Sequence, residues 1–276
     1  MAPLDKWLSG VALSTLLIAA PSADAGEVLD RVMAEGVLVM STDPEYPPQS
    51  SLDESNQFIG FDIDVGKEIA ERLGVEIEFV TPSWDVITAG NWAGRWDVSV
   101  GSMTPTAARR EVLDFPAIYY YTPAALAVHA DNQDIAAPAD AGGKTIGVGV
   151  ATTYENYLKG DLVIDAEGAP SFEYQIADAE IRTYDTDLLA LDDLRLGDGV
   201  RLDAALTALP TITEAVANGY PLKVAGDPVF LEPLSVAIDK GDPEFGAEIG
   251  EIVSAMRDDG TLSELSMKWY GADLTH

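Results

Sequence analysis

The sequence predicts an α/β fold in which a mostly parallel β-sheet is flanked by helices. Apolar segments typical of buried strands alternate along the chain with amphipathic segments typical of helices. This alternation occurs twice, with different residues each time. About 250 residues follow an N-terminal apolar run, a length that allows one large domain or two lobes. The repeated pattern favours two lobes.

The first set of elements begins with a predicted strand at 37–42. A helix is predicted at 62–73, because apolar residues recur every four positions from Phe61 to Leu73 and Gly74 then stops the pattern. Strands at 75–80 and 97–100 and a helix at 84–91 complete this set.

The second set has predicted strands at 144–148, 181–184 and 203–206, and helices at 153–158, 186–196 and 210–217. A strand at 234–238 and helices at 245–257 and 262–270 follow. Pro123 and Pro228 flank the second set as candidate crossover points. We therefore expect lobe 1 to comprise residues 26–122 and 232–276, with lobe 2 (123–231) inserted between them. Two crossings form a hinge beside a cleft that can close on a ligand.

The first 25 residues have the pattern of a cleaved secretory signal peptide. Lys6 precedes an apolar run at 7–20, and Ala23-Asp24-Ala25 matches an A-x-A cleavage site. The run is short for a bilayer span, although a retained membrane anchor is the alternative. The chain has no cysteine, so neither a lipid-modified cysteine nor a disulfide is available.

The formal net charge of −31 is extreme for this length. It argues against nucleic acid and anionic membranes as partners, because both would be repelled. The acidic residues are scattered, which favours a solvated acidic surface over a device that steers cationic ligands.

The segment 101–115 (GSMTPTAARREVLDF) gives the strongest indication of a binding site. Hydroxyls at Ser102 and Thr104 precede Arg109, directly after a predicted strand. A guanidinium matches a carboxylate through two parallel hydrogen bonds, and nearby hydroxyls can complete that anion's bonding. Ligands of parallel sheets bind beyond the carboxyl ends of strands, where Asp43 also falls.

Four segments together resemble the extracytoplasmic solute-binding proteins of bacterial polar amino-acid ABC importers. They are TDPEY (42–46), GFDIDV (60–65), the segment 101–115, and GKTIGVGVATTYENY (143–157). The resemblance covers nearly all of the chain after residue 26. It implies a two-lobed periplasmic binding protein of type II, located in the periplasm and partnered by a permease in the inner membrane. It also implies a small carboxylate-bearing zwitterion as ligand, a polar amino acid in the first place, with no cofactor.

The Thr-x-x-Arg register of this family selects Arg109 over Arg110, which we expect to face water. By resemblance, Arg109 clamps the ligand's α-carboxylate, and Ser102 and Thr104 assist. In lobe 2, Thr152 lies at capping-box spacing from Glu155.

The backbone amide of Thr153 is expected to contact the same carboxylate from a helix N-terminus. Tyr46 and Trp84 match positions where aromatic rings pack on the ligand, although a core position is the alternative for Trp84. We also expect one of the three tyrosines at 119–121 to face the cleft.

Ala208 is the main departure from the family pattern. At this position amino-acid binders usually carry the aspartate that holds the ligand's α-ammonium. Asp43, Glu45 or another acid can substitute; otherwise the cation is methylated and held by aromatic rings, as for a betaine or an ectoine-like solute. A third alternative is a ligand without an amine.

Catalytic and metal-binding signals are scarce, because the chain has two histidines, no cysteine and no glycine-rich phosphate loop. One enzyme alternative is a periplasmic arogenate or prephenate dehydratase. Its general acid is a glutamate whose position here is Thr211. The segment 160–180 is longer than in the family and is expected to form a small hairpin, with structural decoration as its default role and a cleft-rim or dimer contact as the alternative.

Overall fold

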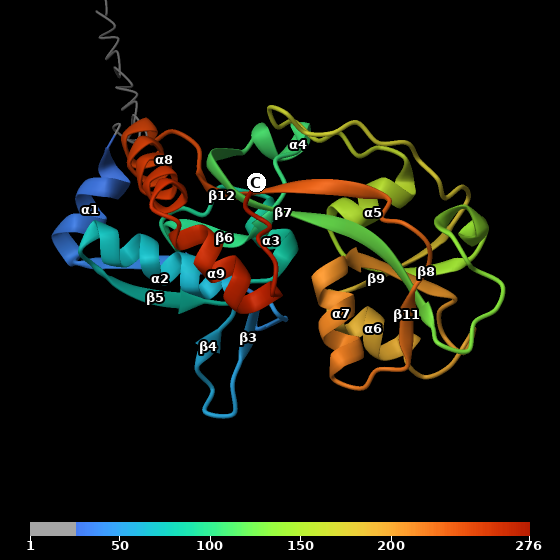
Figure 1. Cartoon of the computed structure of the whole chain (residues 1–276). Coiled ribbons are helices and arrows are strands. Elements are labelled where there is room, and N and C mark those ends of the chain that lie inside the picture. The colour runs from blue at the N-terminus through green and yellow to red at the C-terminus, as the bar shows by residue number, and fades with distance from the viewer. Residues whose placement is uncertain (1–25) are drawn as a thin grey trace, which may run out of the picture.

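The computed structural model describes residues 26–276; the predicted signal peptide lies outside the described residues. Two lobes lie side by side and are joined by the long strands β7 (Leu113–His129) and β12 (Phe230–Asp239), as Figure 1 shows. Lobe 1 contains α1 (Glu27–Glu35), β1 (Val37–Ser41), β2 (Glu45–Tyr46), β3 (Ser50–Leu52), β4 (Phe58–Ile59), α2 (Phe61–Leu73), β5 (Glu76–Val80), α3 (Trp84–Thr88), β6 (Val98–Met103), α4 (Ala107–Arg110), α8 (Pro243–Asp258) and α9 (Thr261–Tyr270). Lobe 2 contains a 3₁₀ turn (Pro138–Ala141), β8 (Thr145–Gly149), α5 (Thr153–Lys159), β9 (Glu180–Tyr184), α6 (Asp187–Leu194), β10 (Ala204–Ala208), α7 (Leu209–Ala217) and β11 (Leu222–Val224).

One sheet runs through both lobes in the order β5-β1-β6-β12-β7-β10-β8-β9, with β11 paired to β7. The strands β5, β1 and β6 are parallel, as are β10, β8 and β9. The pair β7–β12 is antiparallel and connects the two parallel groups. The mostly parallel α/β architecture predicted from the sequence is confirmed, and its parallel strands aim their carboxyl ends at the junction of the lobes.

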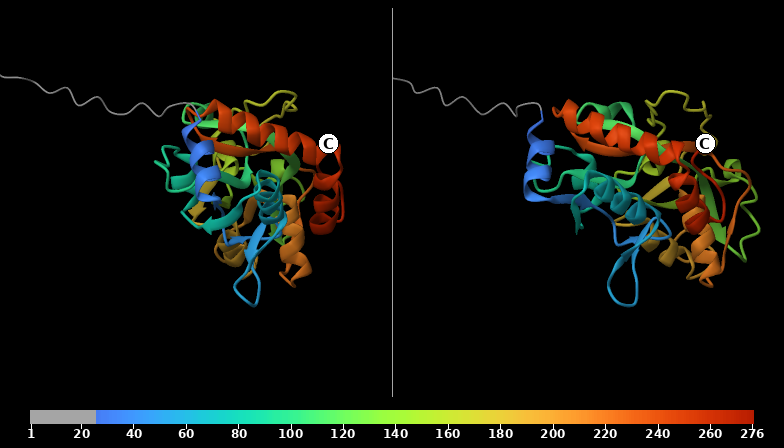
Figure 2. Two further views of the ribbon diagram at one scale, coloured as in Figure 1. Left: turned by 90° about the vertical axis from the view of Figure 1, so that its left-hand side faces the viewer. Right: turned by 60° about the vertical axis from the view of Figure 1, so that its left-hand side comes forward.

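The hinge is a strand pair rather than two loops. Pro123 lies within β7 opposite Leu231 of β12, so the ladder continues across the predicted boundary. The boundaries at 122/123 and 231/232 stay predictions. A small sheet of β2, β3 and β4 projects from lobe 1 as a hairpin (Figure 2).

Each lobe buries apolar side chains on both faces of its part of the sheet. In lobe 1, Leu38 and Phe245 pack on the face covered by α2, α8 and α9. Trp92 and Trp96 pack on the opposite face. The helix α2 illustrates the cause, because its apolar residues recur on one buried stripe and Gly74 ends it in a left-handed conformation (φ 74°).

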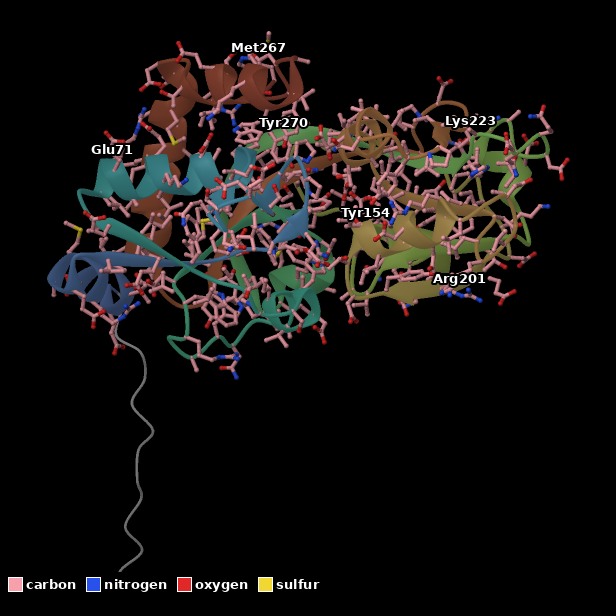
Figure 3. The ribbon with its side chains drawn as sticks, turned by 90° about the horizontal axis from the view of Figure 1, so that it is seen from below. Glu71, Tyr154, Arg201, Lys223, Met267 and Tyr270 are labelled. Atoms are coloured by element: carbon pink, nitrogen blue, oxygen red, sulfur yellow. The ribbon has the colours of Figure 1, made fainter. Side chains whose placement is uncertain are left out.

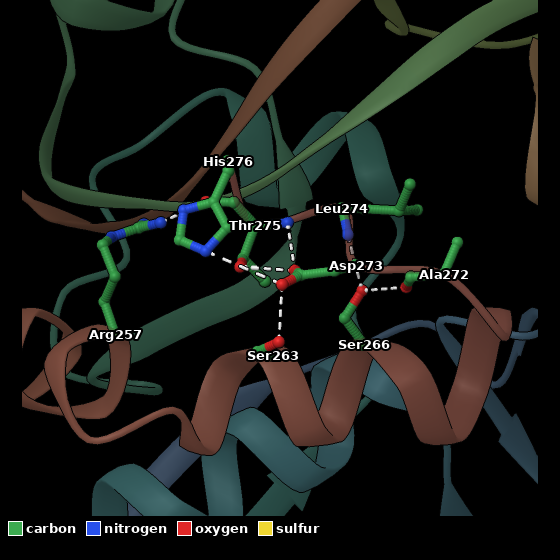
Figure 4. Close-up of polar contacts among 8 residues, drawn as sticks. All are labelled: Arg257, Ser263, Ser266, Ala272, Asp273, Leu274, Thr275 and His276. Atoms are coloured by element: carbon green, nitrogen blue, oxygen red, sulfur yellow. Dashed lines mark hydrogen bonds and ion pairs between the residues drawn. The ribbon is translucent and has the colours of Figure 1, made fainter.

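The C-terminal tail is fastened to lobe 1 beside the hinge (Figure 4). Asp273 accepts a hydrogen bond from Ser263 Oγ on α9 at 2.5 Å. The amide of Leu274 donates to Ser266 Oγ at 2.9 Å, and its carbonyl accepts from the amide of Tyr121 on β7 at 2.8 Å. The tail therefore supports the strand that enters lobe 2.

Two local predictions differ from the structure. The helix expected at 84–91 ends at Thr88. The hairpin expected within 160–180 is wrong: this segment is irregular apart from one bridge between Ile164 and Thr106. Its backbone instead bonds to lobe 1. Within residues 26–276, no helix combines the length and apolarity needed to cross a membrane.

Candidate functional site

A cleft with an empty volume of about 640 Å³, including space open to solvent, lies between the lobes. The carboxyl ends of β1 and β6 face those of β8 and β9 across it. All eight residues predicted for the site line this cleft: Asp43, Tyr46, Trp84, Ser102, Thr104, Arg109, Thr152 and Thr153. Tyr154, which lines it from lobe 2, is visible at the junction in Figure 3.

Arg109 connects the two lobes at the centre of the cleft. Its Nη1 donates to the carbonyl of Thr104 in lobe 1 at 2.9 Å, and its Nη2 donates to the carbonyl of Ala151 in lobe 2 at 2.9 Å. These bonds use two of its five N–H groups. Burial lowers the pKa of Arg109 to about 10, so the guanidinium stays positive at neutral pH.

The local fold around Arg109 fixes its position. Thr106 caps α4 by accepting a hydrogen bond from the amide of Arg109 at 3.2 Å. The guanidinium carbon lies 5.4 Å from the centre of the Trp84 ring. Trp84 is therefore both a wall of the cleft and a platform for Arg109.

The hydroxyls of Ser102 and Thr104 are engaged inside the protein. Ser102 Oγ donates to Asp62 at 2.7 Å and lies 2.5 Å from the hydroxyl of Tyr120. Thr104 Oγ1 donates to Glu232 at 2.8 Å. Both residues line the cleft, but their hydroxyl protons point at buried carboxylates.

The sequence reasoning missed Glu232, which lies on the hinge strand β12 and is 2% exposed. Its carboxylate accepts from Thr104 in lobe 1 and from Thr153 and Tyr154 in lobe 2. Burial raises its pKa, while these hydrogen bonds and Arg109 oppose the rise. Glu232 thus provides an internal carboxylate beside Arg109. The only signal in the sequence is its place next to Pro233 at the second crossing.

The helix start in lobe 2 has the predicted capping arrangement. Thr152 Oγ1 accepts from the amide of Glu155 at 3.2 Å. The Glu155 carboxylate reaches back to the amide of Ala151 at 2.7 Å, one residue before the expected position. The backbone of Thr153 begins the helix at the cleft.

Asp187 is a second buried carboxylate of the cleft that the sequence analysis did not single out. It begins α6 just after β9, lines the cleft and is 7% exposed. Its Oδ1 accepts from the amide of Gly149 at 2.8 Å, and its Oδ2 accepts from Thr207 Oγ1 at 2.7 Å. Within residues 26–276, no basic side chain forms an ion pair with it.

Burial raises the pKa of Asp187 to about 7, and the charge of Asp43 on the facing lobe adds to the rise. Burial also raises the pKa of Asp43. Glu45 is exposed and accepts from Thr186 Oγ1 at 3.3 Å. Ala208 itself is buried in the apolar core of lobe 2, away from the cleft lining. The position of Asp187 after a strand end was readable by the same rule that singled out Asp43.

Of the tyrosines expected at the cleft, Tyr46 lines it and the three at 119–121 do not. Tyr46 lines the cleft, and its hydroxyl lies 3.5 Å from that of Tyr154 across the lobes. The expectation that one of the three tyrosines at 119–121 faces the cleft is wrong. Tyr119 and Tyr120 are fully buried in the core of lobe 1, and none of the three lines the cleft.

Arg110 does not simply face water. Its Nε donates to the carbonyl of Asp165 at 2.6 Å and lies 3.3 Å from that residue's carboxylate. Two backbone bonds accompany it: Ala107 N to Val163 O at 3.0 Å, and Asp165 N to Pro105 O at 2.9 Å. Residues 161–179, which we call the strap, therefore tie lobe 2 to the loop that carries Arg109. Its place at the cleft rim stays a prediction, because no strap residue lines the cleft.

Thr211 occupies the position where a dehydratase would carry its general acid. It is buried, and its hydroxyl lies within hydrogen-bond distance of the side-chain amide of Gln49, at 3.3 Å. It is absent from the cleft lining. A threonine hydroxyl there cannot serve as a carboxylic acid.

Three known proteins show the relationships of the chain. The L-cystine-binding protein TcyJ of Escherichia coli (strain K12) is 30% identical over 255 residues, which span 92% of this chain and 89% of that protein. A probable amino-acid ABC transporter-binding protein of Haemophilus influenzae is 28% identical over 274 residues, which span 99% of this chain and all of that protein (100%). The structure of an ancestral arginine-binding protein bound to arginine superposes with a TM-score of 0.75 at 30% identity, covering 86% of this chain and 99% of the other.

These relatives are binding proteins, and the chain ranks with them rather than with enzymes. The two-lobed α/β fold is the type II periplasmic binding fold that its structural neighbours share. The model of one family matches residues 38–272, nearly the whole described chain. The chain therefore belongs to the bacterial extracellular solute-binding proteins of family 3.

Proposed function

We propose that this protein captures a small zwitterionic amino acid in its interlobe cleft, in the periplasm, and delivers it to an ABC permease in the inner membrane. The observation that carries the proposal is the pairing of opposite charges in one cleft. Arg109 presents a cation, and Asp187 presents a buried carboxylate that lacks a basic partner among the described residues. An α-amino acid carries the two complementary groups.

The α-carboxylate binds at Arg109 in this proposal. The free N–H groups of the guanidinium supply charge-assisted hydrogen bonds, and the amide of Thr153 approaches from lobe 2. Thr104 contributes its hydroxyl only if Glu232 releases it, because that proton is donated to Glu232 in the structure.

The α-ammonium binds at Asp187, with Asp43 facing it from lobe 1. Both carboxylates line the cleft, and the charge of Asp43 contributes to the raised pKa of Asp187. A cation between them removes that repulsion, and the charged pair draws the lobes together. This assignment replaces the family's aspartate at the position of Ala208.

The aromatic-cage alternative has less support. The face of Trp84 is covered by the Arg109 guanidinium, whose carbon lies 5.4 Å from the ring centre. A second cation on that ring would be repelled by the first. We therefore place Tyr46 and Trp84 as walls for the ligand's side chain.

The test is calorimetry with the common amino acids, followed by the variant Asp187→Asn. The variant should weaken binding about 100-fold, because a desolvated ammonium loses its charged partner. Asp192→Asn is the matched control, since Asp192 lies on the same helix but bonds to Tyr220 outside the cleft. Equal affinity in Asp187→Asn, or no heat with any amino acid, contradicts the proposal.

A further inference from the structure

The cleft extends into lobe 1 as a recess between the sheet and the helix α3. Ser41 at the end of β1 and Ser99 on β6 are partners in the parallel ladder, and both line the cleft with 0% exposure. Trp84 and Ile87 of α3 line it as well. The recess is defined here by these four residues.

The hydroxyls of Ser41 and Ser99 have no hydrogen-bond partner within the described part of the protein. A buried hydroxyl without a hydrogen-bond partner is energetically unfavourable. The same face of β1 carries Val39, which packs with Trp92 and Trp96 in the core. Apolar residues would continue that pattern at 41 and 99, so two serines interrupt the core where the cleft meets it.

Gly101 leaves space beside the recess. It follows Ser99 on the same face of β6 and lines the cleft. A Cβ at this position would lie 3.4 Å from Ser99 Oγ and 3.5 Å from Trp84 Cζ3. Any side chain at 101 would therefore pack against the Ser99 hydroxyl, whereas glycine leaves this space between Ser99 and Trp84 unfilled.

We infer that this recess binds the distal end of the ligand's side chain and selects an uncharged hydrogen-bonding group, a carboxamide or a hydroxyl. The inference rests on the proposed function. Serine hydroxyls can donate and accept, which suits a carboxamide. None of the four residues that define the recess is charged, so a buried charge would lack a partner there. An apolar side chain would leave both hydroxyls unpaired, a situation that strongly disfavours such ligands.

The experiment compares ligands of equal shape by calorimetry. Asparagine and leucine have side chains of similar size and differ in hydrogen bonding, and glutamine and methionine form a longer pair. The protein should bind at least one carboxamide at least 10-fold tighter than its apolar counterpart and tighter than glutamate or arginine. The double variant Ser41→Ala/Ser99→Ala should reduce that preference to less than 3-fold. Gly101→Ala should weaken binding of the carboxamide amino acid more than it weakens binding of free glycine, which has no side chain to enter the recess.

Thr122→Val is the matched control, since Thr122 is also buried with an unpartnered hydroxyl but does not line the cleft. It should leave the preference unchanged. Without ligand, the double variant should melt at the same or a higher temperature; a lower one would show that the hydroxyls bond within the protein and would overturn the inference.

Binding of amino acids with no preference for a hydrogen-bonding side chain would overturn the inference and leave the proposed function standing. This result is expected if only water fills the recess. Tighter binding of arginine or glutamate than of asparagine and glutamine would also overturn the inference and leave the proposed function standing. Absence of binding by every amino acid would instead overturn the proposed function, and the inference with it.

Discussion

At the scale of single residues, the cleft is distinguished by charged side chains that are buried. Arg109 is 7% exposed and Glu232 is 2% exposed, and each contacts both lobes through hydrogen bonds. An unpaired charge at such burial would be strongly unfavourable. The proximity of the two groups stabilises both, and it leaves Asp187 and Asp43 as the carboxylates that an external cation can satisfy.

Replacing Arg109 tests the carboxylate site. Arg109→Ala should weaken amino-acid binding by about 3 kcal/mol or more, because the ligand carboxylate and Glu232 both lose their cation. Arg109→Lys should recover only part of this, since an ammonium lacks the planar fork. Titration calorimetry measures both, with Arg182→Ala, an exposed arginine on β9, as the control. Wild-type affinity in Arg109→Ala would remove this residue from the site.

At the scale of elements, the strap joins the two lobes through contacts outside the cleft lining. Its backbone forms two hydrogen bonds with lobe 1 at Pro105 and Ala107, and Arg110 adds a side-chain bond. These bonds flank Arg109 in the sequence. Opening the cleft in the arrangement seen here must break them, so the strap stabilises the closed state in addition to the ligand's own contacts.

The strap predicts an effect on ligand release. Arg110→Ala should increase the dissociation rate roughly 2- to 10-fold and change the association rate less, because a partly exposed ion pair and one hydrogen bond contribute about 1 kcal/mol. Stopped-flow fluorescence of the cleft tryptophan measures both rates. Lys240→Ala is the control, since its pair with Asp114 lies within lobe 1. A dissociation rate equal to that of wild type would show that the strap does not hold the lobes.

At the scale of the whole molecule, buried acids link stability to pH. Burial raises the pKa of Asp62 to about 7, and that of Asp187 to about 7, from the ordinary value of 3.8. Between pH 3.8 and about pH 7, Asp62 and Asp187 keep their protons in the folded protein but have released them in the unfolded chain. The free energy of unfolding therefore falls as the pH rises through this window. The net charge of −31 acts in the same direction, because self-repulsion grows as carboxyls ionise.

We expect the free energy of unfolding in urea to be larger at pH 5.5 than at pH 8, by a few kcal/mol in total. Asp62→Asn should flatten this dependence, since its side chain cannot titrate yet can still accept from Ser102 or Tyr119. Glu71→Gln, on the outward face of α2 (Figure 3), should preserve the slope. A slope of opposite sign would show that Asp62 is stabilised as a carboxylate.

The alternation of strands and helices could be predicted from the sequence, because the periodicity of apolar residues reports local geometry directly. It also indicated which residues follow strand ends, and this was enough to place Asp43, Ser102, Thr104 and Arg109 at one edge of the sheet. Element ends were less certain, as the short helix at Trp84 shows, since capping and packing compete there.

The packed structure was needed to show where side chains from distant segments meet. Glu232 lies 123 positions after Arg109 in sequence and reaches the same cleft through the hinge strand. Asp187 and Asp43 come from different lobes and line the same cleft, and the strap joins lobes that no local pattern connects. Local preferences act over a few residues, whereas burial and charge pairing act across the packed molecule, and therefore the fold was readable from the chain but the partners of its buried charges were not.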